Sequence, residues 1–156
     1  MADLGRPFRA SYVVRGSPPE KVFDALLDVR RFPEWALGLS RARALDDAGK
    51  ETELRPGARL EFVLSAAGLT HRVVGLITVV EAPRRLEWRY TEGARGDGGW
   101  LLEEEAPRAV RLTLSTAYEV SPRWLDTLAH RPFFRGLTEE LLRRSVRRFE
   151  RYLNSQ

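Results

Sequence analysis

The sequence predicts an α+β fold in which one strand and two helices precede six antiparallel strands and a long C-terminal helix. Three patterns lead to this prediction. Polar and apolar residues alternate near the start, the alternation recurs between turn-forming residues from about 39 to 120, and the last part of the chain has a helical period. A chain of 156 residues can form a core without disulfides or a structural metal, so we expect residues 1–156 to form one domain.

The chain opens with an expected strand over residues 7–15 and continues into a helix over about residues 18–30. Ser17 is placed to cap this helix, and Pro18 can occupy the first helical position, where its missing N–H costs nothing. Glu20 follows Ser17 by three residues and would complete a capping box. The sequence therefore predicts how the first helix begins.

Beyond this helix, Pro33 interrupts the apolar pattern and limits residues 32–37 to a short second helix. The period then changes to two, which predicts an antiparallel meander. Both sets of alternate residues in 70–81 are apolar, so either face of that strand could be the inner one. The glycine-rich run 93–99 is interpreted as a hairpin at the rim of the sheet. The six strands are expected at 39–46, 57–66, 70–81, 85–92, 98–105 and 109–120.

A long helix is predicted from about Phe133 to Leu153, which corresponds to roughly 30 Å. One face of this helix is apolar and suited to burial, and the other is charged. The apolar face holds Phe134, Leu141, Ser145, Phe149 and Tyr152, flanked by Leu137, Leu142, Val146 and Leu153.

Positive charge is concentrated in the same C-terminal segment. Residues 1–121 carry 18 basic and 18 acidic side chains, whereas residues 122–156 carry 8 arginines and 4 acidic residues, so the whole net charge of +4 belongs to the latter. One alternative function is therefore an interaction protein whose basic helix binds an acidic partner, a ribosome or an anionic membrane surface. The arginines concerned are Arg143, Arg144, Arg147, Arg148 and Arg151, diluted by Glu139, Glu140 and Glu150.

Several functional classes are excluded or disfavoured by composition. The chain has no cysteine, which excludes thiol nucleophiles, thiolate metal sites and disulfides. Its two isolated histidines, His71 and His130, do not form a metal-ligand pattern, and no nucleotide-binding motif occurs. We therefore expect no metal, no cofactor and no nucleic-acid partner. Without a signal-peptide pattern or an apolar run near the roughly 20 residues of a membrane span, we expect a cytoplasmic protein.

Two segments carry a resemblance to a known superfamily. They are SPPEKVFDALLDVRRFPEW at residues 17–35 and VEAPRRLEW at residues 80–88, and the amphipathic C-terminal helix completes the pattern. Together they resemble the SRPBCC superfamily, which includes START domains, coenzyme Q-binding proteins and birch-pollen-allergen-like proteins, and they are most similar to its polyketide cyclase/dehydrase-like branch. The resemblance implies a helix-grip fold, in which a curved seven-stranded antiparallel sheet surrounds the C-terminal helix and leaves a hydrophobic cavity.

The resemblance also implies a function, which is to bind a small hydrophobic molecule such as a polyketide, a lipid or a quinone-like compound. Cyclisation, dehydration or transport of that molecule are among the activities that the resemblance implies, and the residues themselves supply no convincing acid–base pair. The sequence leaves open whether the chain is an enzyme, which ligand it takes and whether it forms a homodimer.

Candidate ligand-binding residues follow from the strand and helix periods, which point them toward the expected cavity. The same aromatic residues could instead simply fill the core. Hydroxyl groups on this apolar face each need a hydrogen-bond partner, supplied by protein, water or ligand. No catalytic residue is assigned. The candidates are Trp35, Phe62, His71, Trp88, Tyr90, Trp100, Leu102, Leu114, Thr116, Tyr118, Trp124, Leu128, Phe133, Leu137 and Leu141.

Overall fold

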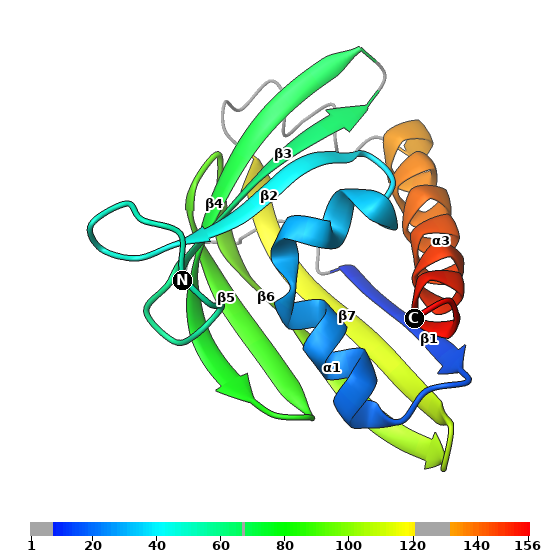
Figure 1. Cartoon of the computed structure of the whole chain (residues 1–156). Coiled ribbons are helices and arrows are strands. Elements are labelled where there is room, and N and C mark those ends of the chain that lie inside the picture. Colours follow the sequence, from blue (N-terminus) through cyan, green and yellow to red (C-terminus); the bar gives the residue numbers. More distant parts are fainter. Residues whose placement is uncertain (1–7, 67, 121–131) are drawn as a thin grey trace.

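The computed structural model describes residues 8–66, 68–120 and 132–156 and confirms the expected α+β order (Figure 1). The second expected helix, placed at residues 32–37, is a 3-10 helix that begins earlier, at Val29, and includes Pro33; it is named η1. The elements are β1 (Phe8–Arg15), α1 (Pro19–Leu27), η1 (Val29–Glu34), β2 (Leu39–Leu45), β3 (Arg59–Ala66), β4 (Leu69–Glu81), β5 (Arg85–Glu92), β6 (Ala94–Ala106), β7 (Ala109–Val120) and α3 (Pro132–Asn154).

The seven strands form one antiparallel sheet in the order β1-β7-β6-β5-β4-β3-β2. The first strand therefore pairs with the last one, and β2 lies at the opposite edge. Helix α1 packs against β6 and β7, η1 against β2, and α3 against β1 and α1, so these helices cover one face of the curled sheet (Figure 1). This is the helix-grip arrangement that the superfamily resemblance implies.

The core lies between this covered face and the helices. Phe23 and Leu26 of α1 are fully buried, as the one-sided apolar pattern of that helix requires. Phe149 of α3 packs against Trp35, with ring centroids 4.4 Å apart. The other contributors are Val14, Val22, Val29, Ala42, Ala44, Leu54, Leu60, Ile77, Leu86, Leu102, Val110, Leu112, Val146 and Leu153.

The C-terminal end of α3 is fixed to the first strand and the first helix by polar contacts. The backbone N–H of Arg15 donates to Glu150 over 2.9 Å, and the Asn154 amide donates to the Arg15 carbonyl over 3.2 Å. Lys21 donates to the Leu153 carbonyl over 2.8 Å, which satisfies one of the carbonyl groups left unpaired at a helix end. These bonds set which face of α3 turns toward the sheet.

The predicted capping box at the start of α1 is wrong. Pro18 occupies the N-cap position in an extended conformation, the helix begins at Pro19, and no side chain caps it. Ser17 is fully buried, and its hydroxyl has no hydrogen-bond partner among the described residues. Because the helix begins one residue later than the sequence suggests, Ser17 lies outside the position from which a hydroxyl reaches the first free N–H groups.

The glycine-rich run begins at the turn of the β5–β6 hairpin, where Gly93 has a positive φ, but most of it belongs to strand β6. Strand β6 already begins at Ala94, and Gly98 and Gly99 pair with Thr116 and Ser115 of β7. A Cβ atom on Gly98 would lie 2.9 Å from the indole of Trp88 on the neighbouring strand. The glycines therefore create the space that a cross-strand tryptophan occupies, which is a packing role that turn statistics do not reveal.

Strand β4 resolves the ambiguity that the sequence left open. His71, Val73 and Gly75 lie opposite Leu64, Phe62 and Leu60, so these residues share one face. A register shift occurs between Ile77 and Val79, and Val80 then lies opposite Leu86. The odd-numbered residues of β4 therefore face the core up to Ile77, and the even-numbered residues face it from Val80 onward. The faces exchange because the register shift inserts one extra residue in β4.

Candidate ligand-binding cavity

A cavity of about 370 Å³ lies between the covered face of the sheet, the segment that follows η1, and α3. This volume falls within the range of about 300–1,000 Å³ that is usual for small-molecule sites. Eight of the predicted site residues line it, namely Trp35, Phe62, Trp88, Tyr90, Trp100, Leu114, Thr116 and Leu141.

Twelve further lining residues were not among the predicted ones. Many of them belong to one stretch, residues 32–39, in which nearly every residue is apolar. A short surface helix buries only one face, so it has fewer apolar side chains than residues 32–39 have. This high apolar content is the signal that could have identified a cavity wall. The twelve are Phe8, Phe32, Ala36, Leu37, Gly38, Leu39, Leu54, Leu60, Leu64, Leu86, Leu142 and Ser145.

The wall of the cavity is neutral. Among the described residues that line it, none is an acid, a lysine, an arginine or a histidine, and the hydroxyl groups come from Tyr90, Thr116 and Ser145. Ser145 accepts a hydrogen bond from the backbone N–H of Leu37 over 2.8 Å and donates to the Leu141 carbonyl over 2.7 Å. This serine therefore joins α3 to the segment after η1 and needs no ligand to satisfy it.

Three aromatic contacts lie in or beside the cavity. The first is the contact between Trp35 and Phe149 described above. The rings of Phe32 and Trp35 meet edge to face at a centroid distance of 5.1 Å, and those of Trp88 and Tyr90 do so at 6.4 Å. Such packed pairs hold rigid, flat surfaces in place. The cavity can therefore accommodate a flat apolar molecule without large rearrangement of its walls.

A chain of two hydroxyl groups crosses the wall formed by β5, β6 and β7. The hydroxyl of Tyr90 lies 3.1 Å from that of Thr116, which in turn donates to the backbone carbonyl of Asp97 over 3.0 Å. Burial raises the pKa of Tyr90 above its ordinary value, and its hydrogen bond with Thr116 only partly opposes this effect. Because a phenol ordinarily titrates near pH 10, Tyr90 stays neutral at physiological pH.

The remaining predicted site residues lie elsewhere or are not described. Leu102 is buried in the core and is not among the lining residues. His71 is half-buried on the same side of the sheet, with its Nε2 atom 2.7 Å from the Gly93 carbonyl, and it is not among the lining residues either. The side chains of Tyr118, Phe133 and Leu137 lie outside the described part of the structure, as do Trp124, Leu128 and His130.

The buried carboxylate of the described residues, Glu61, points away from the cavity. Glu61 is only 3% exposed and accepts hydrogen bonds from Arg43 over 2.7 Å and from Arg72 over 2.6 Å. The Arg43 hydrogen bond, together with that from Arg72, lowers the pKa of Glu61 against the opposing effect of burial. A carboxylate held in its charged form outside the cavity wall is not an acid for chemistry within it.

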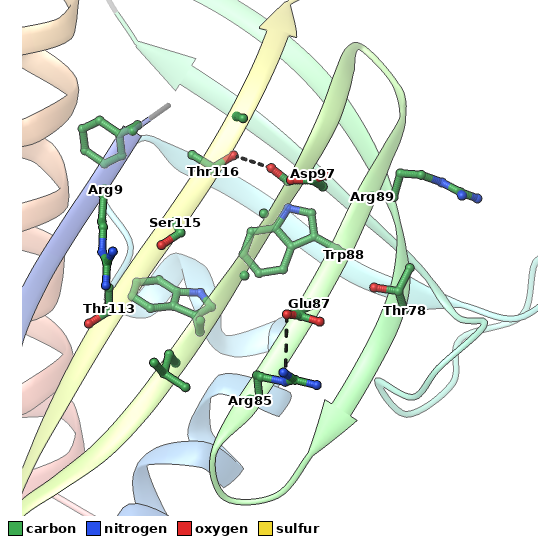
Figure 2. A pocket seen from close by; sticks show the side chains of 16 residues that line it. Arg9, Thr78, Arg85, Glu87, Trp88, Arg89, Asp97, Thr113, Ser115 and Thr116 are labelled. Atoms are coloured by element: carbon green, nitrogen blue, oxygen red, sulfur yellow. Dashed lines mark hydrogen bonds and ion pairs between the residues drawn. The ribbon is translucent and has the colours of Figure 1, made fainter. Parts of the chain in front are cut away.

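A second hollow, of about 860 Å³, is lined mostly by side chains of the outer face of the sheet, although Phe8, Trp88, Trp100 and Thr116 line both it and the inner cavity (Figure 2). Arg9, Thr113 and Ser115 lie along one side of it, and Arg85 and Glu87 lie along the other. Although this groove is larger, its rim is charged and hydroxylated, so an apolar molecule would lose little contact with water there. The smaller inner cavity is the better site for a hydrophobic ligand.

Solved structures of known proteins share this architecture. The chain superposes on the ZhuI aromatase/cyclase from Streptomyces sp. R1128 with a TM-score of 0.74 and 13% identity, covering 96% of this chain and 93% of the other. A START superfamily protein from Mycobacterium smegmatis gives a TM-score of 0.71 at 13% identity, covering 97% and 99%. The protein TTHA0849 from Thermus thermophilus gives 0.71 at 19% identity, covering 96% and 98%.

The fold is the helix-grip fold of these START-like structures. Within this class, residues 8–153 match the family described as polyketide cyclase / dehydrase and lipid transport, and the chain belongs to that family. No curated protein matches the sequence in a direct search. None of the helices in the described residues is long and apolar enough to span a membrane.

Proposed function

We propose that the protein binds a small, flat, hydrophobic molecule in the cavity between the sheet and α3, and that a polyketide, a lipid or a quinone-like ring compound is its natural ligand. The observation that carries this proposal is the cavity itself, which is rich in tryptophan and leucine and has no charged side chain among the described lining residues. Apolar walls with a few placed hydroxyl groups are the usual design of a small-molecule site.

Binding is the part of this proposal that the residues support best. Acid–base catalysis requires a group that titrates near neutral pH within reach of the substrate. The described lining residues offer the neutral phenol of Tyr90 and no carboxylate or imidazole. If a flexible polyketide is the ligand, the contribution of the cavity is to hold it in one folded conformer.

The direct test is to extract purified protein with organic solvent and analyse the extract by mass spectrometry. We expect a hydrophobic compound that is absent from a matched sample of unrelated protein. The stripped protein should then bind a fluorescent apolar probe at one saturable site. An empty extract together with no saturable probe binding would rule out the binding function.

Leu64→Trp should weaken binding of the apolar probe by at least about tenfold, because a larger side chain at this position would fill the cavity. Leu64 lines the cavity but is 38% exposed, so the enlarged side chain can be accommodated without unfolding the core. Leu69, on the next strand, is 41% exposed and does not line the cavity, and Leu69→Trp should leave the affinity within about twofold. Equal loss in both variants would contradict the assignment of the site.

The alternative function, an interaction protein, rests on the outer face of α3. Glu140 forms ion pairs with Arg143 and Arg144, and the Arg148 side chain donates to the Glu34 carbonyl over 2.9 Å. In the described part of the chain, Arg147 and Arg151 are exposed and have no such partner. These two arginines, one helical turn apart, are the groups that an acidic partner would contact.

Replacing Arg147 and Arg151 together by glutamate should abolish a salt-dependent association with an acidic partner and leave probe affinity unchanged, if this alternative holds. The measurement is retention of cell proteins by the immobilised variants at low and high salt. Arg89→Glu, which reverses a charge on the outer face of the sheet, is the matched control. Identical retention by the wild-type protein and the double variant would exclude this surface as an interaction site.

A further inference from the structure

Two buried indole N–H groups of cavity-lining residues have no hydrogen-bond partner. They belong to Trp35 and Trp88, and no acceptor among the described residues lies within hydrogen-bond distance of either Nε1 atom. The other buried side-chain atom in this condition in the described part of the chain is the Ser17 hydroxyl, which does not line the cavity. Native proteins leave few such groups unpaired, so each needs a physical explanation.

Trp35 is the better defined of the two donors, because its ring neighbours are hydrocarbon. The residue is 6% exposed, and its ring contacts Phe149 of α3 at 4.4 Å and Phe32 of η1 at 5.1 Å between centroids. Neither neighbour offers a hydrogen-bond acceptor. Trp88 instead packs against Tyr90, with centroids 6.4 Å apart, and the oxygen of that phenol can accept a hydrogen bond. We therefore base the inference on Trp35.

The hydroxyl groups of the cavity wall do not serve the Trp35 donor. Ser145 is bonded to two backbone groups, and the oxygens of Tyr90 and Thr116 lie 3.1 Å from each other. An indole N–H can only donate, so it needs the lone pair of an oxygen or a nitrogen atom. Because the described part of the wall supplies none to Trp35, a molecule bound in the cavity is the natural source of the acceptor.

A carbonyl oxygen is the acceptor that suits this wall best. It is satisfied by a single donor and brings no proton of its own. A ligand hydroxyl could also accept from the indole, but its own proton would then need an acceptor in surroundings that are mostly apolar. A ketone or a quinone can keep its rings against the aromatic side chains and place one oxygen at the indole nitrogen.

We propose that the cavity binds flat apolar molecules through a carbonyl oxygen, as in a ketone or a quinone, and that the indole N–H of Trp35 donates the hydrogen bond to it. The proposal rests on the proposed function, because it concerns the same cavity. It narrows the ligand class from hydrophobic ring compounds in general to those that carry a carbonyl group, and it gives a partner to a donor that the described chain leaves unpaired.

The test uses two probes of nearly the same shape. They are 2-acetylnaphthalene and 2-isopropenylnaphthalene, in which a C=CH₂ group replaces the carbonyl group. Calorimetric titration gives the dissociation constant of each for wild-type protein and for Trp35→Phe, which keeps an aromatic ring and removes the N–H. We expect the ratio of the ketone constant to the alkene constant to rise about tenfold in Trp35→Phe. Comparison of ratios between proteins cancels the difference in hydration of the two probes.

Trp100→Phe is the matched control. Trp100 also lines the cavity, and its indole nitrogen is not a buried group without a partner. The same volume is removed from the same wall, so both dissociation constants can change. Their ratio should stay within about twofold of the wild-type value.

Infrared spectroscopy supplies a measurement on the wild-type protein alone. The stretching band of a carbonyl group moves to lower wavenumber when its oxygen accepts a hydrogen bond. We expect the band of bound, isotope-labelled 2-acetylnaphthalene to lie below its position in cyclohexane and to return toward that position in Trp35→Phe. A bound ketone with the cyclohexane band would contradict the proposal even if Trp35→Phe does not fold.

The possible outcomes separate this proposal from the proposed function. If both probes bind but Trp35→Phe leaves their ratio unchanged, the assignment of the carbonyl to Trp35 is wrong and the hydrophobic site stands. If neither probe binds the wild-type protein saturably, the proposed function itself fails. A thermal unfolding curve for each variant confirms that the comparison is between folded proteins.

Discussion

Phe149→Ala is expected to lower the free energy of unfolding by about 3–5 kcal/mol, the usual cost of removing a buried aromatic side chain. Phe149 is 1% exposed and holds α3 against Trp35, with ring centroids 4.4 Å apart. Because Trp35 also lines the cavity, loss of this contact should weaken binding of the apolar probe as well. Denaturant unfolding followed by tryptophan fluorescence measures the first effect, and probe titration measures the second.

Two further variants control this prediction. Phe149→Leu keeps much of the buried volume, so it should lower the free energy of unfolding appreciably less than Phe149→Ala does. It should remain folded even if Phe149→Ala does not. Leu69→Ala, at a residue that is 41% exposed, should change the free energy of unfolding by less than about 0.5 kcal/mol. A cost below about 1 kcal/mol for Phe149→Ala would mean that α3 does not pack on the sheet as described.

Gly98→Ala should destabilise the protein by about 1–3 kcal/mol and weaken probe binding, although it adds only one methyl group. The added Cβ would lie 2.9 Å from three atoms of the Trp88 indole, so this cavity-lining ring would have to move. Gly75→Ala on β4 is the matched control. The nearest atoms to its Cβ would be 3.5 Å away, and the change should be tolerated.

A double variant shows whether the clash with Trp88 is the cause. In a Trp88→Ala background, Gly98→Ala should lower the free energy of unfolding far less than it does in the wild-type protein, because the indole that the new Cβ would contact is absent. Additive effects of the two substitutions, measured by denaturant unfolding, would contradict this explanation.

The order of elements could be predicted because each signal is local. Alternation along residues 7–15, the proline at 33 and the two-sided pattern of the C-terminal helix are all visible over a few residues. The start of α1 was predicted wrongly because the spacing of Ser17 and Glu20 suits a cap whether or not the helix begins there. Only packing decides which way Ser17 points, and here it is buried.

The cavity was predictable only in part, for reasons that lie in the tertiary structure. Alternation along β5 and β7 correctly placed Trp88, Tyr90 and Thr116 on the inner face. No period reveals a register shift such as that after Ile77. Nor does the alternation of residues along a strand show that Gly98 leaves room for the Trp88 indole of the neighbouring strand, because the pattern within one strand does not report contacts between strands.

The central claim is that an apolar ligand occupies the inner cavity and not the larger outer groove. A crystal structure of the protein with bound 2-naphthol tests it most directly. We expect density for the ring system between the sheet and α3, in contact with Trp35 and Phe62, which line the inner cavity and not the outer groove. Density confined to the outer groove beside Arg9 and Ser115, or none in the inner cavity at saturating ligand, would contradict the claim.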